Sequence, residues 1–152
     1  MLIQVDVEKE LVSHGRSFKL KAAFTSEEQS VVLFGPSGSG KTLTLQSVAG
    51  LVTPDAGKIA LNGRILFDSK AGINIPSRDR RVGYLFQDYA LFPHLSVADN
   101  VGFSLKKRLG WGSSKAARDR IEELLETFGI SHLARSLPHD LSGGQKQRVA
   151  LA

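Results

Sequence analysis

One stretch of this chain combines glycines, a lysine and a threonine at a spacing that can hold a phosphate group. Residues 35–42 fit the pattern G-x-x-x-x-G-K-[ST]. Glycine tolerates positive φ and lets backbone N–H groups approach an anion closely. Lys41 would place a positive charge on the β- and γ-phosphates of a nucleoside triphosphate, and the hydroxyl of Thr42 would bind Mg²⁺. We therefore expect a phosphate cradle formed by Gly35, Pro36, Ser37, Gly38, Ser39, Gly40, Lys41 and Thr42.

The segments on either side of the cradle have the patterns that such a loop needs. Residues 30–34 form a short apolar run, which predicts a strand buried on both faces. Residues 43–49 are predicted to form a helix, with Gly50 as its C-cap. Strand, turn and helix in this order aim several backbone N–H groups and a helix N-terminus at one point, and that point attracts phosphate.

A second glycine-rich helix start lies close to residue 152. Residues 141–145 read Leu-Ser-Gly-Gly-Gln, and Ser142 and Gln145 have the spacing of a capping box. Gly143 and Gly144 would leave the N–H groups of the first turn open to an anion. Because a helix dipole contributes only about 0.3–1 kcal/mol at an exposed surface, we expect this site to act as one half of a clamp on phosphates held elsewhere.

Composition limits the class of protein. The chain has 152 residues, 41% of them hydrophobic and 23% charged, which is ordinary for one globular domain. It has no cysteine and therefore no disulfide or thiolate metal site. No apolar run reaches the roughly 20 residues of a membrane span and no signal pattern is present, so a cytosolic protein is expected. The net charge is +5, but the basic clusters at 78–81 and 106–108 are small and are interpreted as solvated surface; no nucleic acid is expected.

The N-terminal part is predicted to form an antiparallel sheet. Apolar and polar residues alternate over 1–7 and again over 17–24. The pair Asn62-Gly63, between 58–61 and 64–67, is typical of a two-residue hairpin turn. We therefore expect two strands and a hairpin beside the cradle.

Three further features bear on the site. A strand over 81–86 would deliver Gln87 at its C-terminal end, where open α/β sheets bind ligands. Residues 69–81 are predicted to form a loop. His14 or Phe18 could stack on adenine; the alternative is that Phe18 belongs to the sheet core and His14 to a loop.

The second half of the chain is predicted to be helical. Serines in N-cap positions precede helices over 97–105 and 115–128, and the latter has apolar residues at i, i+3, i+4 and i+7. A further short helical piece is expected before Pro138. The apolar loop 91–95 is expected either to be buried or to form a partner surface, and Trp111 to anchor a turn.

The cradle, Gln87 and the motif at 141–145 occur in the order seen in ATP-binding-cassette (ABC) ATPases, a family that this chain resembles. The cradle is similar to the family's Walker A motif, Gln87 to its Q-loop and residues 141–145 to its signature motif. Residues 80–94 look like the importer branch in particular. Residues 62–76 resemble members that import molybdate. The resemblance covers nearly the whole chain.

This resemblance implies an α/β fold in two parts. A partial P-loop NTPase core with an N-terminal antiparallel β subdomain would occupy about 1–88, and a helical subdomain with the signature motif about 89–152. It also implies a homodimer, or a pair with another ATPase subunit, with ATP and Mg²⁺ held between the cradle of one subunit and the signature motif of the other. Ser142, Gly144 and Gln145 would then reach the γ-phosphate.

The same resemblance implies the catalytic residues and the partner. Lys41 and Gln87 would be catalytic, with Gln87 and Thr42 touching Mg²⁺. The segment around Gln87 would dock onto an integral-membrane permease, which places the protein in the cytoplasm, peripheral on the inner face of the cell membrane. ATP binding and hydrolysis would drive solute uptake. The alternatives are a soluble cassette ATPase acting on nucleic acid or ribosomes, and an inactive nucleotide-binding fragment.

The chain departs from the family pattern after the signature motif. In the family a strand with a Mg²⁺-ordering Asp and a water-activating Glu (Walker B), a D-loop and a switch histidine follow, and these are expected to be absent here. Because general-base assistance is typically worth about 10²–10⁴ in rate, this chain alone is expected to hydrolyse ATP poorly or not at all. It is also expected to be prone to aggregation.

Overall fold

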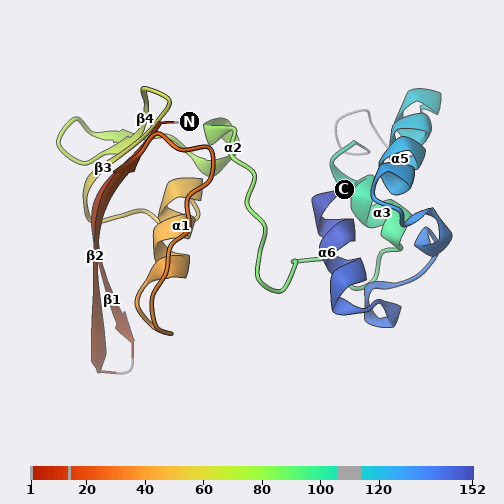
Figure 1. Ribbon diagram of the computed structural model, residues 1–152, viewed down its shortest axis with the longest axis horizontal. Coiled ribbons are helices and arrows are strands. Elements are labelled where there is room, and N and C mark those ends of the chain that lie inside the picture. The colour runs from red at the N-terminus through yellow and green to blue at the C-terminus, as the bar shows by residue number, and fades with distance from the viewer. Residues whose placement is uncertain (1, 14, 106–113) are drawn as a thin grey trace. The chain divides into compact units, whose positions relative to one another are not determined.

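A computed structural model describes residues 2–13, 15–105 and 114–152 of the chain. The described residues fall into two compact units, residues 1–84 and residues 85–152, and each is described by itself (Figure 1). His14, Trp111 and the basic cluster 106–108 lie outside the described residues, so the predictions made for them stay predictions.

The first unit contains a five-stranded antiparallel sheet of order β2-β1-β3-β4-β5. The alternation at the N-terminus correctly predicted the first two strands, although both are longer than expected. The hairpin is also confirmed, since Asn62 and Gly63 adopt φ values of 50° and 78° between β3 and β4. The strands are β1 (Ile3–Ser13), β2 (Arg16–Ser26), β3 (Ala56–Leu61), β4 (Arg64–Asp68) and β5 (Ile73–Asn74).

The core of this unit joins the sheet to helix α1 (Lys41–Ala49). Val48 of α1 packs in one buried cluster with apolar side chains of β1, β3 and β4, and Figure 1 shows the helix lying along the sheet. The expected helix after the cradle is thus confirmed, with Gly50 as a left-handed C-cap. The cluster consists of Val5, Val7, Val48, Ile59, Leu66 and Phe67.

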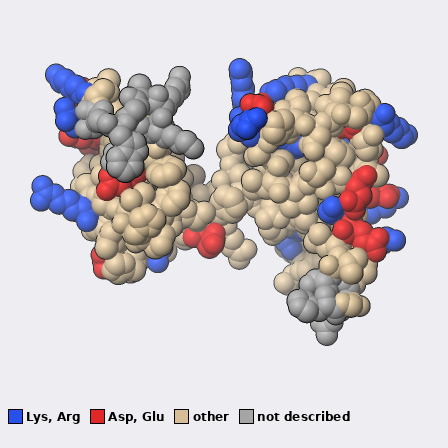
Figure 2. Space-filling model, turned by 180° about the vertical axis from the view of Figure 1, so that it is seen from behind, with Lys and Arg blue, Asp and Glu red and all other residues tan. Residues whose placement is uncertain are grey.

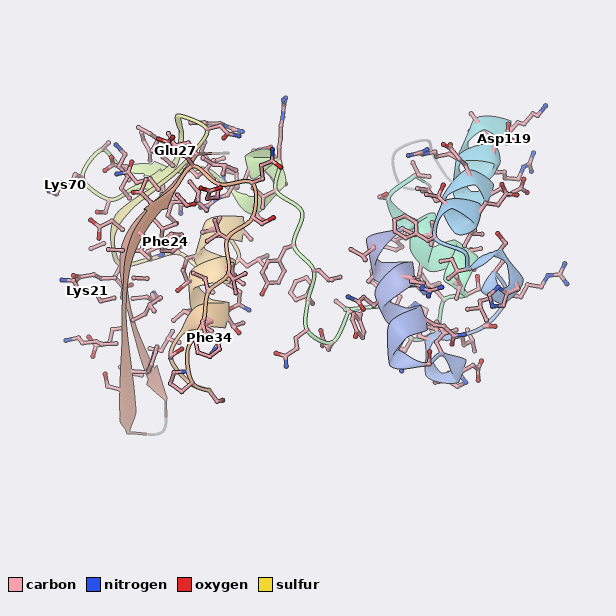
Figure 3. All side chains as sticks on the ribbon, viewed as in Figure 1. Lys21, Phe24, Glu27, Phe34, Lys70 and Asp119 are labelled. Atoms are coloured by element: carbon pink, nitrogen blue, oxygen red, sulfur yellow. The ribbon has the colours of Figure 1, made fainter. Side chains whose placement is uncertain are left out.

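Two strands expected from apolar runs are not formed. Residues 30–34 and 81–86 have no strand hydrogen bonding, and the sheet of the described residues includes neither segment. Val32 is 85% exposed and Phe34, labelled in Figure 3, is 98% exposed. A strand needs the backbone hydrogen bonds of a neighbouring strand, and among the described residues no strand pairs with either run.

The loop prediction for 69–81 was wrong in part. The segment contains the short strand β5 and helix α2 (Ser77–Arg80), which starts after Pro76 and ends where Arg81 turns left-handed with φ 58°. Proline at the N-cap and a left-handed residue after the last turn set both ends of this helix.

The second unit is built from helices around a separate apolar cluster. The helices are α3 (Val97–Val101), α5 (Lys115–Thr127), two 3₁₀ turns η1 (Ser131–Leu133) and η2 (Pro138–Asp140), and α6 (Gly143–Leu151). The helix predicted over 97–105 is interrupted at Gly102, after which residues 103–105 are again helical. The buried cluster consists of Val97, Val101, Ile121, Leu125, Ile130, Leu141 and Val149.

The helix starts of this unit follow the serines in the sequence. The hydroxyl of Ser96 accepts a hydrogen bond from the N–H of Asp99, and that of Ser114 from the N–H of Ala117. N-caps of this kind typically contribute about 1 kcal/mol each. Both serines therefore occupy the positions that the spacing predicted.

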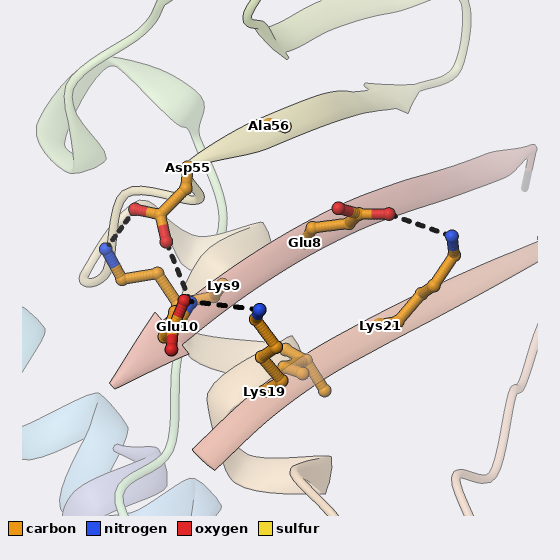
Figure 4. Close-up of a pocket in the computed structure, with 8 residues that line it drawn as sticks. Glu8, Lys9, Glu10, Lys19, Lys21, Asp55 and Ala56 are labelled. Carbon is orange, nitrogen blue, oxygen red and sulfur yellow. Dashed lines mark hydrogen bonds and ion pairs between the residues drawn. The ribbon is translucent and has the colours of Figure 1, made fainter. Parts of the chain in front are cut away.

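A shallow pocket of about 300 Å³ on the β1–β2 face is lined by ion pairs (Figure 4). Lys21 lies 2.9 Å from Glu8, and Lys9 lies 2.6 Å from Asp55. The hydrogen bond from Lys21 lowers the pKa of Glu8, and the backbone N–H of Glu10 lowers that of Asp55. Figure 2 likewise shows both signs of charge interspersed on the face that it draws. We interpret these charged side chains as ion pairs that stabilise the sheet, and not as a ligand site.

Candidate phosphate-binding site

The glycine-rich loop 35–42 forms an open turn at the N-terminus of α1. Gly38 and Gly40 have φ values of 80° and 90°, which favour glycine over residues with a side chain. The N–H of Ser39 donates to the carbonyl of Pro36 at 3.3 Å and closes the turn. Gly40 is the N-cap of α1, and no side chain caps the first turn. The loop therefore leaves helix-terminal N–H groups for an external anion.

Lys41 is folded back onto the same loop. Its Nζ donates to the carbonyl oxygens of Gly35 at 2.8 Å and Pro36 at 2.7 Å, and lies 3.5 Å from Oγ of Ser39. These acceptors are neutral, so a phosphate oxygen carrying negative charge would compete well for the ammonium group. The lysine is held where a bound phosphate can take over its hydrogen bonds.

Thr42 is exposed in the first turn of α1. Its hydroxyl is an oxygen donor of the kind that Mg²⁺ accepts, and Mg²⁺ usually takes only one or two protein ligands beside phosphates and water. Among the described residues, no three His, Cys, Asp or Glu side chains gather to hold a metal ion. The donor set therefore fits Mg²⁺ that arrives with a nucleotide, and does not form a metal cage by itself.

Phe18 lies against the end of the cradle. An atom of its ring is 3.3 Å from the point where Gly40 would carry a Cβ, and the side chain is 37% exposed. Its assignment to the buried sheet core is therefore wrong, because β2 contributes Leu20 to the buried positions and leaves Phe18 partly open. A larger residue at position 40 would collide with Leu20 and press on the Phe18 ring.

Arg80 is a residue whose role the sequence did not reveal. The run 78–81 was expected to be solvated surface, yet Arg80 is only 2% exposed. Its guanidinium donates to the carbonyls of Ser47 at 2.7 Å, Val48 at 2.9 Å and Ile75 at 2.7 Å, and to Oδ1 of Asn74 at 3.1 Å. Burial lowers its pKa, although an arginine stays protonated.

These contacts make Arg80 the cap of the helix that carries the cradle. The carbonyls of Ser47 and Val48 belong to the last turn of α1, where helix carbonyls lack intrahelical partners and a cation is favoured by the dipole. The spacing of charged residues in 78–81 contains no signal for which arginine turns inward. Which arginine is buried is decided only by the packing of α2 against α1 and β5.

Gln87 belongs to the second unit, where it is exposed. The loop that follows is held by Asn100, whose Oδ1 accepts from the N–H of Phe92 at 2.8 Å and whose Nδ2 donates to the carbonyls of Phe92 and Leu95. The ring of Phe92 lies 4.2 Å, centroid to centroid, from that of Phe103, and both rings are partly exposed. The loop is thus buried in part, since Leu91 packs against the apolar cluster of this unit while Phe92 stays exposed. Its role as a partner surface stays a prediction.

The signature-like motif is a capped helix start, as the spacing predicted. Oε1 of Gln145 accepts from the N–H of Ser142 at 2.8 Å, and the hydroxyl of Ser142 accepts from the N–H of Gln145 at 3.4 Å. Gly143 and Gly144 have open space where a Cβ would lie. The helix end is therefore accessible, but the carbonyl oxygen of the Gln145 side chain is already used within the cap.

The predicted site residues are divided between the two units. All eight cradle residues lie in the first unit, whereas Gln87 and residues 142–145 lie in the second. Within the described part of the chain, no helix is long and apolar enough to cross a membrane.

Comparisons with known proteins agree on one family. Residues 20–152 match the ABC transporter family. The chain is 50% identical over 121 residues to the Fe(3+) ions import ATP-binding protein FbpC 2 of Pectobacterium atrosepticum, covering 79% of this chain and 33% of that protein. It is 44% identical over 136 residues to the molybdenum import ATP-binding protein ModC of Rhizobium etli, covering 89% and 37%. The chain thus spans about a third of the length of these curated relatives.

Solved structures with a similar fold are ATP-binding cassettes. One is a dimeric post-hydrolysis state of a cassette bound to ADP and Pi, with a TM-score of 0.72 and 27% identity, covering 99% of this chain and 67% of that one. Another dimeric bacterial transporter cassette has a TM-score of 0.69 and 26% identity, with the same coverage. The expected fold class, a partial α/β P-loop NTPase core with an antiparallel sheet and added helices, is confirmed.

Proposed function

This chain belongs to the ABC transporter family, which it matches over residues 20–152, and on that premise we propose that it is the nucleotide-binding part of an importer ATPase. The observation that carries the proposal is the cradle itself, an uncapped helix N-terminus with two left-handed glycines and an inward lysine. The whole protein would couple ATP binding and hydrolysis to solute uptake through a membrane permease. Its place would be the cytoplasm, at the inner face of the membrane.

The cradle residues have distinct roles in this proposal. The N–H groups at the start of α1 bind phosphate oxygens, and Lys41 exchanges its bonds with Gly35 and Pro36 for bonds to the β- and γ-phosphates. In the assembled protein, Thr42 and Gln87 would be the residues that hold Mg²⁺, which would supply positive charge beside the transferred phosphoryl group. Gln87 also orients the attacking water. Phe18, whose ring lies beside Gly40, would stack on the adenine ring.

The second anion site completes the clamp from a partner subunit. Ser142, Gly143, Gly144 and Gln145 would contact the γ-phosphate of the nucleotide bound to the other copy. The accessible helix start at Gly143 and Gly144 supports this role, and so does the dimeric state of the similar cassettes. An exposed helix N-terminus is too weak to bind a nucleotide alone, so closure requires phosphates already held by a cradle.

Gly144→Asp is expected to prevent ATP-dependent dimerisation while leaving nucleotide binding to the cradle intact. A carboxylate at this helix start would face the γ-phosphate, and like charges at an interface cost enough to weaken dimerisation at least about tenfold. The fold should tolerate the change because a side chain at 144 meets no neighbour. Light scattering after gel filtration with ATP and Mg²⁺ measures the dimer.

The matched control is Gly144→Ala, which adds a Cβ into open space without a charge and should dimerise like wild type. Dimerisation of Gly144→Asp at the wild-type ATP concentration would contradict the proposed clamp. So would a wild-type chain that binds ATP and stays monomeric at every concentration.

The exposed aromatic pair of the second unit suits a permease contact. Phe92 lies on a loop that Asn100 holds in place, and its ring stacks on that of Phe103 in the helical residues 103–105. Both rings remain partly open to solvent. A rigid apolar surface of this kind can anchor a partner segment at low entropic cost. We place the contact with the permease here, a few residues after Gln87.

The experiment that tests the importer proposal is a pull-down with the chain as bait. Membrane permeases of iron and molybdenum importers are expected to be captured, and Phe92→Ser with Phe103→Ser is expected to lose them. Exposed Leu151, in helix α6 of the same unit, provides the control, Leu151→Ser, which should still capture the permease. The alternative, a cassette ATPase acting on nucleic acid, predicts instead RNA or DNA binding that falls steeply with salt. Permeases of both kinds are used because the chain is similar to ATP-binding proteins for Fe(3+) import and for molybdenum import.

A further inference from the structure

A second basic site lies on the first unit, away from the cradle. Arg64, Arg78, Asp79 and Arg81 line an open surface pocket of about 510 Å³, which we call the arginine cavity. Its volume is within the roughly 300–1,000 Å³ of small-molecule sites. Three guanidinium groups and one carboxylate leave an excess of two positive charges around it.

The chain forms this cavity by turning one arginine of helix α2 inward. Arg80 is locked in the interior by four hydrogen bonds, while Arg78 and Arg81 on either side of it are exposed. Strand β4 adds Arg64, whose Nη2 donates to the carbonyl oxygen of Asp79 at 2.9 Å. The hydrogen bonds of Arg80 and Arg64 therefore hold helix α2 against helix α1 and strand β4, the elements beside the cavity.

The positive charge of the cavity is not neutralised within the described chain. Arg78 lies 3.6 Å from the carboxylate of Asp79, and both side chains are largely exposed, so this pair contributes little. The Arg81 side chain has no ion-pair partner among the described residues. Arg64 uses one of its five N–H donors on Asp79. Donors and charge remain for a ligand.

Arg81 also carries a backbone feature that suits a site. Its φ of 58° is a left-handed conformation, which is strained for a residue with a side chain. Such conformations persist where the surroundings impose them, and here the inward Arg80 holds the preceding turn. This left-handed turn brings Arg81 to the cavity, where it lies with Arg78 and Arg64.

We propose that the arginine cavity binds a small soluble anion that carries phosphate groups, at a site separate from the nucleotide cradle. Guanidinium groups present paired donors that match the oxygens of a phosphate, and three of them favour a ligand with more than one negative charge. The cradle lies at the N-terminus of α1, whereas Arg80 caps its other end. Nine helical residues place these two ends about 13 Å apart.

The test uses inorganic pyrophosphate as the probe, measured by calorimetry at low salt without Mg²⁺. Lys41→Ala serves as the background so that the cradle does not contribute. In that background the combined change Arg64→Gln, Arg78→Gln and Arg81→Gln is expected to weaken binding by about tenfold or more. Asp79→Asn is expected to tighten it about threefold, because it removes the one negative charge at the cavity.

The matched control removes the same charge elsewhere on the first unit, as Lys21→Gln, Lys58→Gln and Lys70→Gln. An equal loss in the two triple variants would show that binding follows net charge, and would overturn the proposal. Unchanged affinity in the arginine variant, or unchanged affinity in Asp79→Asn, would also overturn it. Tight binding of a single-stranded oligonucleotide with no binding of pyrophosphate would make the ligand a nucleic acid and the proposal wrong. Asp79→Asn is expected to bind pyrophosphate more tightly, which a folding defect would not produce. The test therefore remains decisive even if the triple arginine variant folds poorly.

Discussion

Replacing Lys41 by alanine is expected to weaken ATP binding on the order of a hundredfold or more. Hydrogen bonds from a charged group contribute about 1.5–3 kcal/mol each, and Lys41 is placed to make at least two to phosphate oxygens in exchange for those it makes to Gly35 and Pro36. Titration of a fluorescent ATP analogue into both proteins measures the loss. The affinity for AMP should change little, because AMP has no β- or γ-phosphate for the lysine to contact.

The control for this variant is Lys70→Ala, which removes an exposed lysine of the same unit at the far end of the sheet (Figure 3). It should bind ATP like wild type. Equal ATP affinity in Lys41→Ala and wild type would contradict the role given to Lys41. A loss that is the same for ATP and AMP would show that the lysine supports the loop's conformation rather than the phosphates.

The second large effect is expected for Arg80→Ala, which should lower the free energy of unfolding of the first unit by about 3 kcal/mol. The change leaves three carbonyl oxygens and the side-chain oxygen of Asn74 without their donor, in a place where Arg80 excludes water. Each buried acceptor left unpaired costs about 1–3 kcal/mol, and water that enters the vacated space recovers part of the sum. Urea unfolding followed by circular dichroism measures the difference.

An exposed arginine in the same helix provides a matched control for this prediction. Arg78→Ala alters the same four-residue helix, but its side chain is largely exposed, so its effect should stay within about 0.5 kcal/mol. Arg80→Lys should recover only part of the loss, because an ammonium has three donors and cannot reach acceptors on α1 and β5 at once. If Arg80→Ala and Arg78→Ala were equally stable, the capping role of Arg80 would be wrong.

Loss of Arg80 should also loosen the position of the cradle residues. The guanidinium fixes the C-terminal end of α1, and the N-terminal end of the same rigid helix presents Gly40, Lys41 and Thr42. A helix that is free at one end holds the other less firmly against the sheet. The two largest predictions therefore concern opposite ends of one nine-residue helix.

Local features of this protein could be predicted from the sequence because they depend on neighbours in the chain. The left-handed glycines of the cradle, the Asn62-Gly63 turn, and the box between Ser142 and Gln145 each need only a residue type and a spacing of one to three positions. The order of the three motifs also sufficed to indicate the family. Sequence patterns of this kind thus determined the family and indicated the phosphate-binding chemistry that we propose for the chain.

The tertiary structure alone decided the features that depend on partners far away in the chain. Residues 30–34 and 81–86 have the composition of buried strands but are not strands of the described sheet, because strand formation requires hydrogen bonds from a neighbouring strand that composition does not specify. Arg80 and Arg81 are adjacent and chemically identical, yet the carbonyls at the end of α1 bury one and leave the other to the arginine cavity. Burial and pairing are properties of contacts, and contacts exist only after the chain has folded.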